Sequence, residues 1–179
     1  MPDTYEFYWT ATPVTLVNRL LDERDKYWDD SRRAKAAALG MTPAEVHTLA
    51  SIVASERNKT DEWGKIARLY LNRISKNMPL QADPTVVFAL GDFSIRRVTG
   101  THLKVDSPYN TYTHRGLPPG PIRMVERAQL DAVLDAPAHD YLYMCAKPDF
   151  SGYHNFAKDY QRHRLNAALY YRALEARGL

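Results

Sequence analysis

The segment Thr42-Pro-Ala-Glu45 forms the strongest helix start in this chain. A capping threonine and a glutamate three residues later can each accept the other's backbone amide proton, and proline suits the first turn. Val46, Leu49, Val53 and Glu56 then follow at offsets of 0, 3, 7 and 10 residues. At about 100° per residue, these side chains share one stripe roughly 80° wide. The pattern predicts a helix that packs on a core and carries a carboxylic acid at the end of its apolar face.

Similar start and stop signals predict further helices along the chain. We expect them at residues 12–29, 32–39, 60–77, 83–91, 125–134 and 159–177. In the last of these, the apolar residues Leu165, Ala168, Leu169 and Ala173 fall on one face.

Two short runs are typical of strands. Residues 141–146 form an apolar run, and a turn at 147–152 leads to a second run at 153–156, so the two are expected to pair as a hairpin. The chain shows no internal repeat, low-complexity segment or linker. The sequence therefore predicts one α+β domain, mostly helical, with a small β-hairpin.

Composition argues against several functions. The formal charge of +3 is spread along the chain without a block of like charges, which is not the pattern of a nucleic-acid-binding protein. The single cysteine, Cys145, is expected to be a core residue, and the six histidines show no metal-binding spacing. We expect neither a metal nor a cofactor.

The beginning of the chain is aromatic and carries no leader, which suggests a fragment without its targeting segment. No run of about 18 apolar residues is present, so we expect the chain as given to be soluble.

Glu56 is the most informative side chain. Burial on an apolar face disfavours the charged carboxylate and raises its pKa toward the range of a general acid at neutral pH, which is the pattern of a glycosidase acid. The alternative is that Glu56 pairs with Arg57 or Lys59 at a helix end.

A second cluster, Gln81, Asp83 and Thr85, surrounds a helix start, where ligand binding is possible. The alternative is that Asp83 serves only as the N-cap.

A third cluster is a loop beside a proline-rich segment, and its aromatic and amide side chains are those that sugar sites use. Its members are Tyr109, Asn110, Thr111 and Tyr112. His154 lies in a strand-like stretch between aromatic residues, where it would face a cleft. The alternatives are a surface turn packed on the core and a structural histidine.

Seven motifs resemble, in order, those of the MltG or YceG-like endolytic murein transglycosylases. They are Ala50-Ser-Ile-Val-Ala-Ser-Glu56, Tyr70-Leu-Asn-Arg73, Met78-Pro-Leu-Gln-Ala-Asp-Pro-Thr-Val86, Ser107-Pro-Tyr-Asn-Thr-Tyr112, Gly116-Leu-Pro-Pro-Gly-Pro-Ile122, His139-Asp-Tyr-Leu-Tyr143 and His154-Asn-Phe156. The resemblance implies an N-terminal segment at residues 1–40 and a mostly helical, lysozyme-like catalytic domain at residues 41–179.

The resemblance implies that Glu56 is the catalytic acid. The residues expected along the glycan cleft are Gln81, Asp83, Thr85, Tyr109, Asn110, Thr111, Tyr112, His154 and Asn155. One departure from the family pattern concerns the motif around Glu56, where Ala54 replaces an acid and Arg57 a threonine. Glu56 is then the sole acid of that motif.

The implied reaction cleaves the bond between N-acetylmuramic acid and N-acetylglucosamine. Glu56 would protonate the bridging oxygen and then take the proton of the muramic 6-hydroxyl, which closes a 1,6-anhydro ring. Two alternatives stay open. One is a hydrolytic muramidase with Asp83 as the second carboxylate, and the other is a noncatalytic glycan-binding module.

The resemblance also implies partners and a location. The partners are peptidoglycan glycan strands and peptidoglycan synthases, with a role in ending glycan elongation. Family members sit at the periplasmic face of the inner membrane through an N-terminal anchor and carry a LysM-like portion, and we expect the anchor and most or all of that portion to be missing from this chain.

Overall fold

The computed structural model describes residues 2–56 and 59–178. Its elements are, in order, α1 (Pro13–Tyr27), α2 (Asp30–Ala38), α3 (Pro43–Ser55), the 3-10 turn η1 (Thr60–Glu62), α4 (Trp63–Ser75), α5 (Asp83–Leu90), the 3-10 turn η2 (His102–Lys104), α6 (Arg127–Leu134), β1 (Tyr143–Ala146), β2 (His154–Ala157) and α7 (Tyr160–Glu175). The predicted α+β class is confirmed, because several helices accompany one small sheet.

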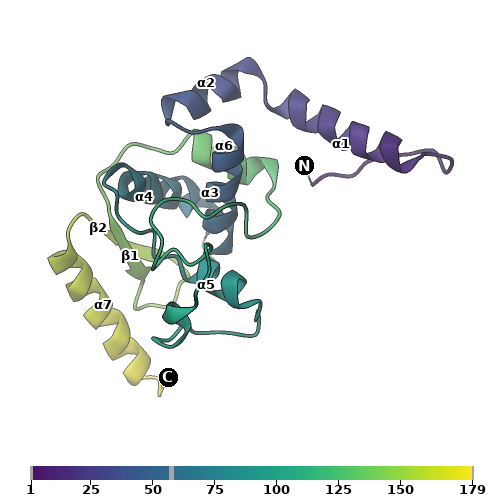
Figure 1. Cartoon of the computed structure of the whole chain (residues 1–179). Helices are drawn as coiled ribbons and strands as arrows, with labels where there is room; N and C mark the ends of the chain where they lie inside the picture. The colour runs from purple at the N-terminus through teal and green to yellow at the C-terminus, as the bar shows by residue number, and fades with distance from the viewer. Residues whose placement is uncertain (1, 57–58, 179) are drawn as a thin grey trace.

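Helix α3 lies at the centre of the core and begins as predicted. The Thr42 hydroxyl accepts the amide proton of Glu45 at 3.3 Å, and the Glu45 carboxylate accepts that of Thr42 at 2.7 Å. Five apolar residues of α3 are fully buried, namely Val46, Leu49, Ala50, Ile52 and Val53. Helix α3 packs against α4 and α6 (Figure 1). This three-helix core holds the end of α3, and with it Glu56, in a fixed place.

Strands β1 and β2 form the predicted antiparallel hairpin, with Tyr143 opposite Ala157 and Ala146 opposite His154. Strand β1 begins two residues later than predicted, and β2 begins one residue later. The side-chain amide of Asn72 binds the carbonyl oxygens of His139 and Tyr141, at 2.7 and 3.1 Å, which holds this segment against α4.

Helix α7 covers the hairpin, but not with the face that the apolar spacing favours. Leu165 and Leu169 are 55% and 50% exposed, so the apolar face that the spacing indicates points away from the hairpin. The buried side of α7 instead carries Asn166, and His163 stacks on Tyr143 with ring centroids 5.3 Å apart. Aromatic stacking on the sheet thus decides which way the helix faces.

Helix α1 extends away from the rest of the molecule (Figure 1). The predicted Thr12 cap is confirmed, since its hydroxyl accepts the amide proton of Thr15 at 3.2 Å. Leucines of α1 stay partly exposed, whereas Tyr27 and Trp28 at its end are buried. The Tyr27 hydroxyl donates to Asp131 of α6 at 2.9 Å, which ties the end of α1 to the core.

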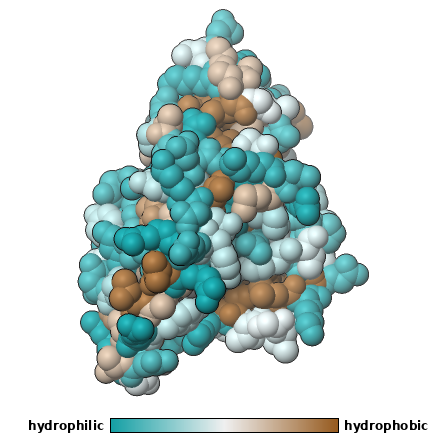
Figure 2. All heavy atoms as spheres, turned by 90° about the vertical axis from the view of Figure 1, so that its left-hand side faces the viewer, coloured by the Kyte–Doolittle hydropathy of each residue, from teal (hydrophilic) through white to brown (hydrophobic). Residues whose placement is uncertain are grey.

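Figure 2 looks onto the side where α7 lies and shows separate apolar patches in a mostly hydrophilic surface. Among the described helices, none has the length and apolar character needed to span a bilayer.

Candidate active site

Glu56 is the C-terminal cap of α3, and its backbone amide donates to the carbonyl oxygen of Val53 at 3.2 Å. Its side chain is partly buried and meets α4, where the hydroxyl of Tyr70 donates a short hydrogen bond to Oε1. The negative end of a helix disfavours a carboxylate, and so does burial. Glu56 therefore sits where a protonated carboxyl is favoured.

The pKa of Glu56 reflects these surroundings. Burial raises it from the ordinary glutamate value to about 7, with a further upward push from the negative charge of Asp83. The Tyr70 hydrogen bond and the positive charge of Arg73 act in the opposite direction. A carboxyl with this pKa can give up a proton and take one back near neutral pH, as a general acid and base must.

Arg73 connects the site to the hairpin and to the segment before α5. Its guanidinium is buried and donates to the carbonyl oxygens of Leu142 at 2.6 Å and Leu80 at 2.8 Å. Gln81 follows with a φ of 52°, in the left-handed region that non-glycine residues seldom adopt. The turn brings the first residue of α5, Asp83, to the side of Glu56.

Asp83 does not cap α5. The N-cap is Ala82 and makes no side-chain hydrogen bond, so the alternative in which Asp83 serves only as a cap is wrong. The Asp83 carboxylate instead accepts the hydroxyl of Tyr112 at 2.5 Å. Because the Asp83 side chain does not cap the helix, its carboxylate can also contact a ligand.

Thr85, Asn110 and Thr111 lie beneath this surface and are no more than 1% exposed. The Thr111 hydroxyl accepts the amide proton of Ala82 at 3.0 Å and lies 2.8 Å from the Thr85 hydroxyl. The Asn110 side chain donates to the carbonyl oxygens of Leu103 and Val105 within its own loop, at 3.0 and 2.9 Å. In this structure these side chains bind protein groups and hold Asp83 and Tyr112 in place.

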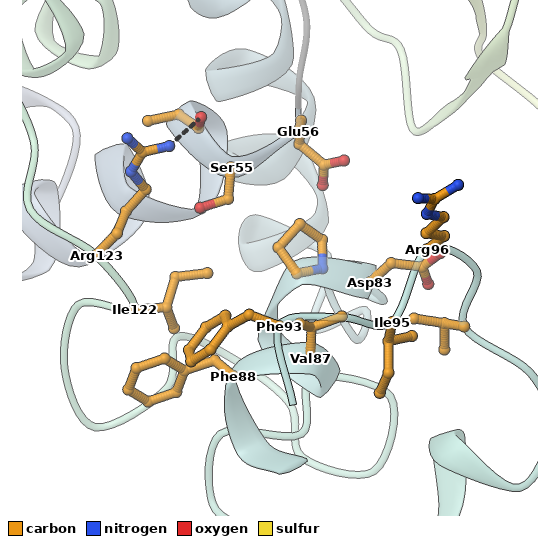
Figure 3. Close-up of a pocket in the computed structure, with 13 residues that line it drawn as sticks. Ser55, Glu56, Asp83, Val87, Phe88, Phe93, Ile95, Arg96, Ile122 and Arg123 are labelled. Atoms are coloured by element: carbon orange, nitrogen blue, oxygen red, sulfur yellow. Dashed lines mark hydrogen bonds between the residues drawn. The ribbon is translucent and has the colours of Figure 1, made fainter. Parts of the chain in front are cut away.

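Two pockets meet at Glu56 and Asp83. The apolar pocket, about 730 Å³, is lined by Ala54, Ser55, Glu56, Asp83, Pro84, Val87, Phe88, Phe93, Ile95, Arg96, Val98, Ile122 and Arg123. The tyrosine pocket, about 390 Å³, is lined by Glu56, Leu69, Tyr70, Arg73, Leu80, Gln81, Asp83, Tyr112, Met144, Cys145, Ala146, His154, His163, Ala167, Tyr170 and Tyr171. In the view of Figure 3, Glu56 lies between Arg123 on one side and Asp83 and Arg96 on the other.

The wall of the apolar pocket near Ile122 depends on a buried serine. Ser51 of α3 donates to the carbonyl oxygen of Thr48 at 2.7 Å and accepts the amide proton of Ile122 at 2.9 Å. This pair of bonds fixes the proline-rich loop beside α3, so Ile122 and Arg123 reach the pocket next to Glu56.

The remaining expected residues lie around these pockets. His154 lines the tyrosine pocket, and its Nδ1 lies 2.8 Å from the carboxylate of Glu62, which is buried. Tyr109 packs on Phe88, with ring centroids 4.8 Å apart. Asn155 lies in β2 opposite Cys145 and lines neither pocket. Thus Gln81, Asp83, Tyr112 and His154 join Glu56 at the pockets, and the others lie behind or beside them.

Several pocket residues were not expected from the sequence. The sequence pattern could have identified Arg73. It lies on the same helix face as the buried Ile66 and Tyr70, and so, like Glu56, it is a charged residue on an apolar face. Phe93 and Arg96 carried no such signal, since their segment has neither helix nor strand periodicity. Arg57, considered as an ion-pair partner of Glu56, lies outside the described residues.

Within the described part of the chain, no three His, Cys, Asp or Glu side chains gather as a metal site would require. The chemistry available at the pockets is that of carboxyl, hydroxyl, imidazole and guanidinium groups.

The sequence matches the YceG-like family over residues 1–168. A Bacillus subtilis protein named endolytic murein transglycosylase is 34% identical over 146 residues, 82% of this chain and 40% of that protein. A Streptococcus pneumoniae protein of the same name is 29% identical over 153 residues, 81% of this chain and 27% of that protein. The crystal structure of a yceG-like protein from Listeria monocytogenes has a TM-score of 0.77 and 33% identity, covering 92% of this chain and 53% of that one. The chain thus spans less than half the length of these curated relatives.

Proposed function

We propose, because this chain belongs to the YceG-like family, that it cuts peptidoglycan glycan strands internally as a lytic transglycosylase. The observation that carries the proposal is the carboxyl of Glu56, which has a pKa of about 7 and lies where two pockets meet. The curated relatives named endolytic murein transglycosylase support the same reaction.

Glu56 performs both proton transfers in the proposed reaction. The protonated carboxyl gives its proton to the oxygen that links N-acetylmuramic acid to N-acetylglucosamine, and that bond breaks through an oxocarbenium-like transition state. The resulting carboxylate takes the proton of the muramic 6-hydroxyl as its oxygen bonds to the anomeric carbon. Each proton given is recovered, so Glu56 returns to its starting state and no water enters.

Asp83 acts beside Glu56 through its charge. Its carboxylate raises the pKa of Glu56 and, near a developing oxocarbenium ion, stabilises positive charge. The Tyr112 hydroxyl fixes the orientation of Asp83. One proton-transferring acid suffices in this scheme, because the nucleophile belongs to the substrate.

The two pockets give room for sugar residues on both sides of the bond that breaks. We propose that Gln81, Tyr112 and His154 bind the strand in the tyrosine pocket, and that the aromatic rings of Phe88 and Phe93 face sugars in the apolar pocket. Thr85, Tyr109, Asn110, Thr111 and Asn155 support these surfaces from behind or beside them.

The reaction places the protein at the cell envelope, where its substrate occurs. We extend the proposal to the periplasmic face of the inner membrane and to work beside peptidoglycan synthases, where cutting a nascent strand would end its elongation. The proposed chemistry uses no cofactor.

The position of Asp83 beside Glu56 favours one further candidate, a muramidase in which Asp83 activates water on the opposite face of the sugar. Mass spectrometry of glycans released from purified sacculi separates the two reactions. Anhydro-muramic ends support the transglycosylase, whereas reducing ends that have gained water support the muramidase.

The Glu56→Gln variant tests the catalytic assignment. It should lose at least about a hundredfold in cleavage rate while still binding glycan, because the amide keeps the shape of the carboxyl but cannot act as an acid near neutral pH. Unchanged turnover would refute the role of Glu56, and glycan binding without cleavage by the unaltered protein would indicate a binding module.

A further inference from the structure

Two arginines line the apolar pocket, and in the view of Figure 3 Arg123 lies on one side of Glu56 while Arg96 and Asp83 lie on the other. They are Arg96, in the segment after α5, and Arg123, in the loop after Ile122. Both side chains are exposed, and the proposed reaction uses neither of them. The pocket surface between them is largely apolar, with Val87, Phe88 and Ile122 among its members.

Arg123 is held in place beside the end of α3. Its Nη1 donates to the carbonyl oxygen of Ala54 at 3.1 Å, and its Nε donates to that of Met124 at 3.3 Å. These bonds occupy two of the five donor hydrogens of a guanidinium group. Ala54 is two residues before Glu56, so the remaining donors of Arg123 and its full positive charge are left for a ligand near the end of α3.

Arg96 belongs to the wall of the same pocket, between Ile95 and Val98, which also line it. Among the described residues, no carboxylate forms a salt bridge with Arg96 or Arg123. Their charges are therefore not balanced by direct pairing within that part of the chain.

The proposed substrate carries charged groups beside its sugar chain. The sugar rings of murein carry no charge, but every second sugar, the muramic residue, bears a short peptide that ends in free carboxylates. When a strand is cut after one muramic residue, the next muramic residue lies on the other side of the bond, beyond one N-acetylglucosamine. Peptides would therefore leave the strand on both sides of Glu56.

We propose that Arg96 and Arg123 recognise the carboxylates of the peptides that branch from the murein strand where it lies along the apolar pocket. The inference rests on the proposed function and names the part of the substrate that the apolar pocket selects. A guanidinium can bind a carboxylate through two parallel hydrogen bonds, which gives direction as well as attraction. Sugar rings would cover the apolar surface between the arginines, so strands without acidic peptides should bind less tightly.

The test compares three glycan substrates of equal length: strands with acidic peptides, strands whose peptide carboxylates are amidated, and strands stripped of peptides by an amidase. Arg96→Gln and Arg123→Gln should each raise KM for the acidic strands about fivefold, the effect of one exposed ion pair at the upper end of its usual range. The kcat should stay near that of the unaltered protein. Cleavage of the other two substrates should not change, and Arg96→Lys should restore part of the affinity.

Arg97→Gln is the matched control, because Arg97 is an exposed neighbour that does not line the pocket. Equal losses on acidic and stripped strands, or no loss on either, would overturn the inference. Stripped strands also keep the two proposals apart, since their cleavage by the unaltered protein and not by Glu56→Gln tests the reaction without any peptide present.

Discussion

The hydroxyl of Tyr70 donates a hydrogen bond to Oε1 of Glu56, joining the middle of α4 to the end of α3. Tyr70 is buried and Glu56 is partly buried, and burial raises the pKa of each. The bond favours the charged form of Glu56, whereas burial and Asp83 favour the protonated form. The balance among these effects sets the pH at which the site can work.

Cleavage should depend on a protonated Glu56. With a pKa of about 7, half of the molecules carry the proton at that pH, and the fraction falls tenfold for each further pH unit. We expect kcat/KM to decline above pH 7 with a single apparent pKa near that value. A rate that stays flat to pH 9 would contradict the role of Glu56 as the acid.

Replacing Tyr70 with phenylalanine should move the decline of kcat/KM to higher pH, by about one pH unit. The reason is that the variant loses the hydrogen bond that favours the carboxylate form of Glu56. The kcat should also fall, since the carboxyl is less firmly oriented. Tyr27→Phe is a suitable control, because Tyr27 is another buried tyrosine bonded to a carboxylate and lines neither pocket. A shift to lower pH in Tyr70→Phe would refute the proposed effect.

Asp83→Asn should move the decline of kcat/KM to lower pH. The negative charge of Asp83 raises the pKa of Glu56, so its removal lowers that pKa and leaves less protonated enzyme at pH 7. The pH dependence of cleavage for this variant measures the shift. Asp135→Asn, which removes an exposed carboxylate paired with Lys35, should leave the profile unchanged.

Glu56→Gln should make folding less sensitive to pH. The folded carboxyl has a higher pKa than the unfolded one, so the native protein loses stability as pH rises from about 4.5 to 7, by up to about 3 kcal/mol. Glutamine does not ionise, so the variant does not lose this stability as pH rises. In urea unfolding, the variant should gain stability relative to the unaltered protein between pH 4 and pH 8, and a constant difference would argue against the raised pKa.

Thr111→Val should reveal a supporting role. The change leaves the buried amide of Ala82 without its acceptor, which costs about 1–3 kcal/mol of unfolding free energy. Thr113→Val, at an exposed hydroxyl nearby, should cost about 0.5 kcal/mol or less. Unchanged stability with a raised KM would instead make Thr111 a direct ligand of the glycan.

Much of the fold could be predicted because the start of a helix depends on residues that are close together in the sequence. Thr12, Thr42 and Asp159 all cap helices with their own side chains, and each bond involves residues three positions apart. The position of Glu56 at the end of an apolar face follows from the same local spacing. Signals of this kind need no knowledge of the rest of the molecule.

Features that depend on distant segments could not be predicted in this way. The side of α7 that packs is decided by His163 stacking on Tyr143, and the role of Asp83 is decided by Tyr112. The hydroxyl partner of Glu56 depends on how α3 and α4 pack together. In α3 the sequence spacing indicated which positions are buried, but not which polar atoms meet there.

The apolar pocket and the tyrosine pocket share Glu56 and Asp83. A strand bound across both pockets would, after cleavage, leave one fragment in each pocket. Neither fragment would need to pass Glu56 and Asp83 in order to dissociate. The two fragments could then depart in either order. Added short glycans that resemble one fragment should compete with the intact strand for that pocket alone and leave the other pocket free to release its fragment.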